Sequence, residues 1–296
     1  MRWFPAVLVA VVSCLAFATL GCGGSSTSDA SGGSGGSGGS GASGGNGATG
    51  GSGGTTPTEV LCDGSDAIRF LYRSAGGYVE QSYGFTNPHG HSFLAVTGKC
   101  EAFAGNDYMS GIFTLTLSET QAAQLSKDVG RDQITGWSKY PDQQSCPDAG
   151  SVSISDGKNQ AWCSCGCDPG VPPGIEVALK KASTWLDTVF DQGAALTGPV
   201  AVAARPDGNP IPGQTPLAWP LAWPVSSLPS AYDTTTGKQV TDAGEASQLR
   251  KLRSDTLAAL SYASYILVVD AAAAPFEVYV RDELPPTVEA ALDAME

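Results

Sequence analysis

The sequence has few of the residues that catalytic and metal sites use most often. Histidine occurs twice in 296 residues, and Asp, Glu, Lys and Arg together make up 15% of the chain. No H-E-x-x-H, P-loop or EF-hand pattern occurs beyond residue 57. The main part of the chain therefore lacks the common zinc-protease, nucleotide-binding and calcium-loop motifs.

Positive charge is also scarce. The chain has 16 Lys and Arg against 29 Asp and Glu, which gives a formal net charge of −13. A strongly acidic protein is repelled by the phosphates of nucleic acids and by anionic lipid headgroups. The charge therefore disfavours an anionic membrane surface as the main partner, and we expect no nucleic-acid partner.

Both histidines lie in the short segment Asn87-Pro88-His89-Gly90-His91. On a strand, His89 and His91 would point to the same side and could serve together as metal ligands. We favour a turn beside Pro88 and Gly90, because an H-x-H pair is a weak pattern and no acidic ligand motif stands near. The sequence therefore predicts no cofactor.

The N-terminal segment has the pattern of a secretory signal peptide. Arg2 precedes a mostly apolar run that reaches Leu20, with small residues near its end. The run ends Leu20-Gly21-Cys22, which resembles the lipobox of bacterial lipoproteins. The resemblance implies cleavage before Cys22 and attachment of a diacylglycerol to its thiol.

Two alternatives remain open for this segment. The motif Ala16-Phe17-Ala18 matches an ordinary signal cleavage site, which would release a soluble protein. The apolar run is also nearly long enough to span a membrane. All three interpretations place the rest of the chain outside the cytoplasm. We expect a lipid anchor at Cys22 that attaches the protein to the cell envelope, at the outer membrane or cell surface.

Residues 23–57 consist almost entirely of Gly, Ser, Thr and Ala, with Asp29 as their one charge. Such a segment cannot bury enough apolar surface to offset the entropy of ordering, so it predicts a flexible linker. The expected organisation is a signal peptide (1–21), a lipidated cysteine with its linker (22–57) and a globular exported domain (58–296). A Pro-rich stretch near 205–229 marks a place where this domain could subdivide.

Six cysteines remain in the domain, an even number that predicts disulfides in an exported protein. A bridge within a C-x-C unit is strained. We therefore expect each of Cys163, Cys165 and Cys167 to pair with one of Cys62, Cys100 and Cys146. The alternative is a metal or redox site, which this cysteine cluster would form with the two histidines.

The predicted fold class is α+β, with a mainly antiparallel sheet and three to four helices. Alternating apolar residues and turn signals predict strands within 68–73, 78–85, 91–96, 99–103, 112–117, 151–155, 160–165, 265–269 and 276–281. The segment 78–85 is expected to pair with the first strand. Helices are expected after the capping box at Ser118, after Pro173, near Asp242 and at Pro286.

The Pro-rich segment carries Trp219 and Trp223, four residues apart. They could form a stacking platform for sugar rings or a partner, but we favour burial of both as lids over the core. The sequence as a whole favours a tethered binding or structural module of the cell envelope, with envelope proteins or polysaccharide as partners. The alternative is an exported hydrolase or metalloenzyme that uses His89 and His91.

Overall fold

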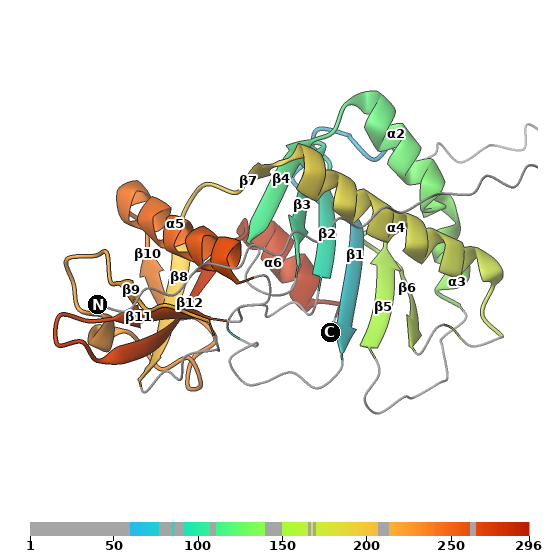
Figure 1. The fold of residues 1–296 in the computed structure, drawn as a ribbon. Coiled ribbons are helices and arrows are strands. Elements are labelled where there is room, and N and C mark those ends of the chain that lie inside the picture. The colour runs from blue at the N-terminus through green and yellow to red at the C-terminus, as the bar shows by residue number, and fades with distance from the viewer. Residues whose placement is uncertain are drawn as a thin grey trace, which may run out of the picture. The chain divides into compact units, whose positions relative to one another are not determined.

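The computed structural model describes residues 60–76, 85, 92–106, 111–139, 150–164, 167, 170–206, 213–260 and 265–295. Cys22 and the predicted signal peptide and linker lie outside these ranges, as do His89, His91, Cys146 and Cys165. Residues Thr55–Glu296 form one compact unit. Its described part is α+β and mainly antiparallel, as predicted, with two sheets and five α-helices (Figure 1).

The first sheet has seven strands, and every neighbouring pair is antiparallel. In spatial order they are β6 (Gln160–Ser164), β5 (Gly150–Ser155), β1 (Ile68–Gly76), β2 (Ser92–Thr97), β3 (Glu101–Gly105), β4 (Ile112–Thr116) and β7 (Ala194–Ala195). Both edges of β1 are occupied, by β2 and by β5. The predicted pairing of β1 with 78–85 is therefore wrong, because a strand has only two edges.

The second sheet has five strands and is antiparallel except at one pair. In spatial order they are β10 (Lys238–Val240), β8 (Val200–Pro206), β12 (Pro275–Asp282), β11 (Ile266–Val269) and β9 (Leu217–Ala218). The pair β11 and β9 is parallel. The chain leaves the first sheet after β7 and enters the second at β8, so the change of sheet comes before the Pro-rich stretch near 205–229.

Helices cover both faces of the seven-stranded sheet (Figure 1). On one face lie α2 (Glu119–Asp128), α3 (Ile134–Trp137) and α4 (Pro173–Gln192), with the 3₁₀ turn η1 (Arg131–Gln133) between α2 and α3. The buried stripe of α4 repeats every three to four residues and packs against the inward side chains of β1, β2, β3 and β5. On the other face, α6 (Pro286–Asp293) packs against β1, β2 and β3.

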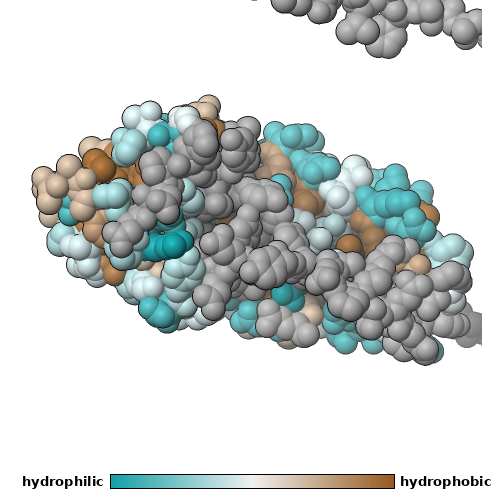
Figure 2. All heavy atoms as spheres, turned by 60° about the horizontal axis from the view of Figure 1, so that its bottom comes forward, coloured by the Kyte–Doolittle hydropathy of each residue, from teal (hydrophilic) through white to brown (hydrophobic). Residues whose placement is uncertain are grey.

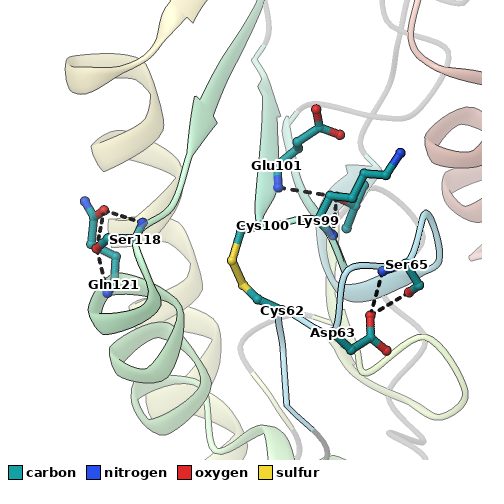
Figure 3. The surroundings of a disulfide bond; sticks show 9 residues. Cys62, Asp63, Ser65, Lys99, Cys100, Glu101, Ser118 and Gln121 are labelled. Carbon is teal, nitrogen blue, oxygen red and sulfur yellow. Dashed lines mark hydrogen bonds between the residues drawn. A yellow bond between two sulfur atoms is a disulfide. The ribbon is translucent and has the colours of Figure 1, made fainter.

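The helix boundaries follow from local chemistry. At the start of α2, the Ser118 hydroxyl accepts a hydrogen bond from the Gln121 backbone N–H at 3.2 Å. The Gln121 side chain in turn accepts one from the Ser118 N–H at 2.9 Å, which completes the predicted capping box (Figure 3). Just beyond α2, Gly130 takes a positive φ of 55°, which ends the helix.

The five-stranded sheet packs one face on α5 (Ala243–Ala259), through Leu249, Leu252 and the apolar residues of β8, β11 and β12. The 3₁₀ turn η2 (Val225–Ser227) closes this core from the side. The opposite face of the sheet holds a smaller apolar cluster, in which Phe85 and Tyr279 are buried. Both faces of this sheet are therefore covered over most of its length.

A buried charge cluster joins the two sheets. Asp282, at the end of β12, has a side chain that is 1% exposed and accepts hydrogen bonds from Arg250 at 2.6 Å and Arg253 at 2.7 Å. The same carboxylate accepts the backbone N–H of Ile112, the first residue of β4, at 3.1 Å. Asp282 therefore links an edge region of the first sheet to the second sheet and its helix.

Candidate functional site

The first disulfide lies near the start of the described domain, in a segment that we call the domain entry (residues 60–65; Figure 3). Cys62 is bonded to Cys100, which follows the turn after β2, and the two residues are 38 apart in sequence. Leu61 is 3% exposed, whereas Val60 is 64% exposed. The covalent bond therefore lies next to the point where the chain passes from the exposed Val60 to the buried Leu61.

Hydrogen bonds reinforce this entry. The Gly64 N–H donates to the carbonyl of Gly98 at 2.7 Å, so the entry segment is held to the turn that carries Cys100. Asp63 accepts both the hydroxyl of Ser65 at 2.6 Å and its backbone N–H at 3.0 Å, and it also pairs with Arg69. These two bonds from Ser65, helped by Arg69, lower the pKa of Asp63 to about 2. The aspartate acts as a turn cap.

The second disulfide corrects a prediction. Cys163 is bonded to Cys167, four residues away, with their Cα atoms 4.5 Å apart. Cys62 and Cys100 also bond to each other, so the expectation that each cluster cysteine pairs with Cys62, Cys100 or Cys146 is wrong. The strain of a bridge within a C-x-C unit disfavours a bond between adjacent cysteines of the cluster, but it does not exclude a bond between Cys163 and Cys167. Cys167 has a φ of 66°, a left-handed conformation that turns the chain back towards the end of β6.

The two tryptophans of the Pro-rich segment pack against the apolar core between the five-stranded sheet and α5. The rings of Trp219 and Trp223 are half-buried and meet edge to face, with centroids 5.1 Å apart and an interplanar angle of 66°. The Trp219 indole N–H donates to the Trp223 carbonyl at 2.7 Å. The Trp223 N–H donates to the carboxylate of Glu245 at 3.2 Å, and Lys238 lies 3.6 Å above the Trp223 ring. This is not the coplanar, exposed pair that a stacking platform requires.

The described surface is mixed in character. Within the described ranges, no helix is long and apolar enough to cross a membrane. The same ranges contain no cluster of three or more His, Cys, Asp or Glu side chains placed to hold a metal ion. The space-filling view shows hydrophilic and hydrophobic residues intermixed among the coloured atoms (Figure 2).

A concave surface with polar lining lies on the face of the first sheet that carries α6. On β5, Val152 and Ile154 pack into the core beneath α4, so Ser151, Ser153 and Ser155 point to the opposite face. The middle strand of this region therefore places three hydroxyl groups on this face, and Ser153 and Ser155 are 7% and 6% exposed.

The neighbouring strands carry larger side chains on that same face. On β6, Ala161 and Cys163 belong to the α4 core, so Gln160 and Trp162 share the face of the serines. On β1, Arg73 pairs in register with Ser153, which in turn pairs with Trp162. A small residue therefore stands between an arginine and a tryptophan in one row across three strands.

Two adjacent cavities follow from this arrangement, and we call them together the β5 groove. The first has a volume of about 350 Å³ and is lined by Arg73, Ser151, Ser153, Gln160, Trp162, Ala294 and Met295. The second, of about 620 Å³, shares Gln160, Ala294 and Met295 and extends along α6 past Leu71 and Ser155 to Asp66 and Lys158. The end of α6 therefore forms one bank of the groove, and the sheet forms its floor.

The β5–β6 turn at the end of the groove is well braced. The Asp156 carboxylate accepts the backbone N–H groups of Lys158 at 2.8 Å and Asn159 at 2.7 Å. Burial opposes ionisation of Asp156, but these hydrogen bonds prevail and hold its pKa below the usual value. The turn positions Gln160 at the start of β6, where it lines both cavities.

A further cavity of about 780 Å³ lies beside the entry disulfide. It is bounded by Val60, Leu61 and Cys62 on one side and by α2 and η1 on the other. Ala122, Ala123 and Ser126 line it together with Glu119, Lys127, Asp132 and Gln133. These lining residues include no aromatic side chain, so the cavity offers no ring on which a ligand could stack.

Sequence reasoning predicted the strands that carry the β5 groove but not the groove itself. The available indication was the sequence Ser151-Val152-Ser153-Ile154-Ser155, which places three hydroxyls on one face. Comparison with protein-family models, with curated proteins and with solved structures gave no match for this chain. The function must therefore be argued from the site itself.

Proposed function

We propose that this chain is an exported lipoprotein whose folded domain is a tethered binding module of the cell envelope. The observation that carries the proposal is the Cys62–Cys100 disulfide at the domain entry. Disulfides form and persist in oxidising compartments and are rare in the cytosol. Two disulfides among the described residues are compatible with a protein that works outside the cytoplasm.

The position of the entry disulfide also suits a tethered domain. A domain anchored at its N-terminus receives any pull on the anchor at its N-terminal residues. Here those residues are covalently bonded to the turn between β2 and β3, two central strands of the seven-stranded sheet. A pull on the N-terminus is therefore passed to the sheet and does not peel away the entry segment.

The sequence upstream supplies the other parts of the proposal. The Leu20-Gly21-Cys22 ending supports lipid attachment at Cys22, and residues 23–57 have the composition of a flexible linker. The typical span of such a linker is about 30–35 Å. An anchor followed by this spacer would keep the domain near a membrane and leave it free to reorient towards a partner.

The β5 groove favours binding as the role of the domain. Its lining combines hydroxyl and amide groups with one tryptophan, all held on strands of a packed sheet. Polar groups at fixed positions beside an aromatic surface orient and retain a ligand. The strands also restrict movement of the lining, which reduces the entropy lost when a ligand binds.

Metabolic labelling tests the anchor. The full-length chain is expressed with its own N-terminus in a bacterial host that is fed an alkyne analogue of palmitate, and the protein is then isolated from membranes. We expect label in the wild type and in Cys14→Ser, whose cysteine lies within the predicted signal peptide, and no label in Cys22→Ser. An unlabelled wild type, or label that persists in Cys22→Ser, would refute lipid attachment at Cys22.

A further inference from the structure

We propose that the β5 groove binds a saccharide chain with an uncharged backbone, in an extended conformation along β5. This inference rests on the proposed function only in that an envelope location brings saccharide polymers within reach. Its central row is Arg73, Ser153 and Trp162, which face one another across three hydrogen-bonded strands.

The spacing of the sheet sets the width of the groove. Neighbouring strands are about 4.8 Å apart, so the backbones of Arg73 and Trp162 are separated by about 10 Å. Ser153 lies between them at the bottom of the cavity and is 7% exposed. The result is a trough with a hydroxyl floor, an aromatic wall on β6 and a guanidinium wall on β1.

The length of the groove favours a chain over a single small molecule. Side chains on one face of a strand repeat every two residues, about 6.7 Å. The hydroxyls of Ser151, Ser153 and Ser155 therefore extend over roughly 13 Å. The neighbouring cavity shares Gln160 and Met295 and continues past Ser155 towards the β5–β6 turn.

The lining matches the chemistry of a sugar ring. A pyranose has an apolar face of C–H groups and an edge of hydroxyls, each of which both donates and accepts a hydrogen bond. The Trp162 ring offers an apolar surface to the C–H face of the sugar. Serine hydroxyls and the Gln160 amide offer donors and acceptors to the sugar hydroxyls. The apolar bank of Ala294 and Met295 faces this polar floor.

Charge argues against the other polymers of a cell. A net charge of −13 opposes binding of nucleic acid or of strongly anionic polymers. A lipid acyl chain has no hydrogen-bonding groups to offer the hydroxyl and amide groups of the lining. An uncharged polymer with many hydroxyls has neither disadvantage.

Binding is tested with two saccharide probes. The purified full-length chain is incubated in detergent with peptidoglycan sacculi and, separately, with cellulose, a neutral polysaccharide, and the bound fraction is measured against concentration. We expect saturable binding to at least one probe. Binding to sacculi alone identifies the wall as the source of the saccharide, and binding to cellulose identifies a neutral polysaccharide.

Groove variants locate the binding. We expect Trp162→Ala to weaken it about tenfold and Trp162→Phe to retain most of it. Gln160→Ala is expected to weaken it about threefold to tenfold. Gln124→Ala, a matched change on the exposed face of α2, is expected to leave it unchanged. Circular dichroism and thermal unfolding of each variant separate lost binding from lost folding, and Gln160→Ala provides a test if Trp162→Ala does not fold.

No saturable binding to either probe would overturn the proposal. Equal binding by the wild type, Trp162→Ala and Gln160→Ala would overturn it as well. The Cys22→Ser variant is expected to bind each probe to the same extent as the wild type, because the groove does not involve the anchor. A failure of lipid labelling and a failure of saccharide binding are therefore distinguishable.

Discussion

The two sheets are held in different ways. The seven-stranded sheet and its flanking segments carry both described disulfides, at Cys62–Cys100 and Cys163–Cys167. The five-stranded sheet and α5, residues 200–282, contain no cysteine. They contain ion pairs with buried carboxylates instead, at Arg205–Glu277 and around Asp282.

The two kinds of bond differ in how they respond to salt and pH. A disulfide is unaffected by salt and by moderate changes of pH, whereas an ion pair requires both partners to stay charged. The covalent bonds lie at the domain entry and at the end of β6. The ion pairs with buried carboxylates lie in the region joined to the first sheet through Asp282.

The largest expected effect is the loss of the Asp282 carboxylate. Asp282→Asn leaves Arg250 and Arg253 without their common counter-charge inside the protein. We expect the free energy of unfolding to fall by about 3–5 kcal/mol, measured by urea denaturation. Asp255→Asn, which breaks the exposed pair with Lys251, is the control and should cost less than about 1 kcal/mol. Equal effects would mean that the buried cluster does not hold the second sheet.

The entry disulfide should have an effect of similar size in the first sheet. Replacing Cys62 and Cys100 together by alanine removes a cross-link between residues 38 apart. The chain-entropy relation predicts a loss of about 4 kcal/mol. Urea denaturation with and without a reductant measures it: the wild type should lose stability on reduction and the double variant should lose less. If the free energy of unfolding of the wild type did not change under reductant, the stabilising role of the disulfide would be contradicted.

The second disulfide closes a much shorter loop and should matter less. The sequence separation of Cys163 and Cys167 is 4, for which the same relation predicts about 2 kcal/mol. The double alanine variant should therefore unfold at a urea concentration between those of the wild type and the Cys62/Cys100 variant. A larger loss than that of the Cys62/Cys100 variant would show that this bond holds more than its own loop.

The smallest effect is the acid response of the entry turn. The folded pKa of Asp63 is about 2, below its usual value of 3.8. A depressed acid pKa stabilises the fold above pH 3.8, and this contribution is lost as the pH falls from about 4 to about 2. An NMR titration of the Asp63 carboxyl should give about 2, and Ser65→Ala should move it towards 3.8. A pKa unchanged by that substitution would show that Ser65 is not the cause.

Much of the fold could be predicted because its elements carry local signals. The capping box at Ser118, the apolar stripe of α4 and the turn between β5 and β6 each depend on residues close in sequence. The strand β8 was not predicted. Both faces of Val200–Ala204 are buried, so the run lacks the alternation that marks a half-exposed strand.

The site was less predictable because it depends on distant parts of the chain. The row of Arg73, Ser153 and Trp162 requires the pairing of β1 with β5 and of β5 with β6. Disulfide connectivity likewise depends on which cysteines the fold brings together. Cys146 and Cys165 lie outside the described residues.

Peptide mapping by mass spectrometry, without reduction, tests the central claim of an exported and lipid-anchored domain most directly. For protein isolated from the membranes of expressing cells, the account predicts an N-terminal peptide that begins at Cys22 and carries a diacylglycerol. It also predicts linked peptides for Cys62–Cys100 and Cys163–Cys167. A mature chain that keeps residues 1–21, or one whose cysteines are all free thiols, would contradict it.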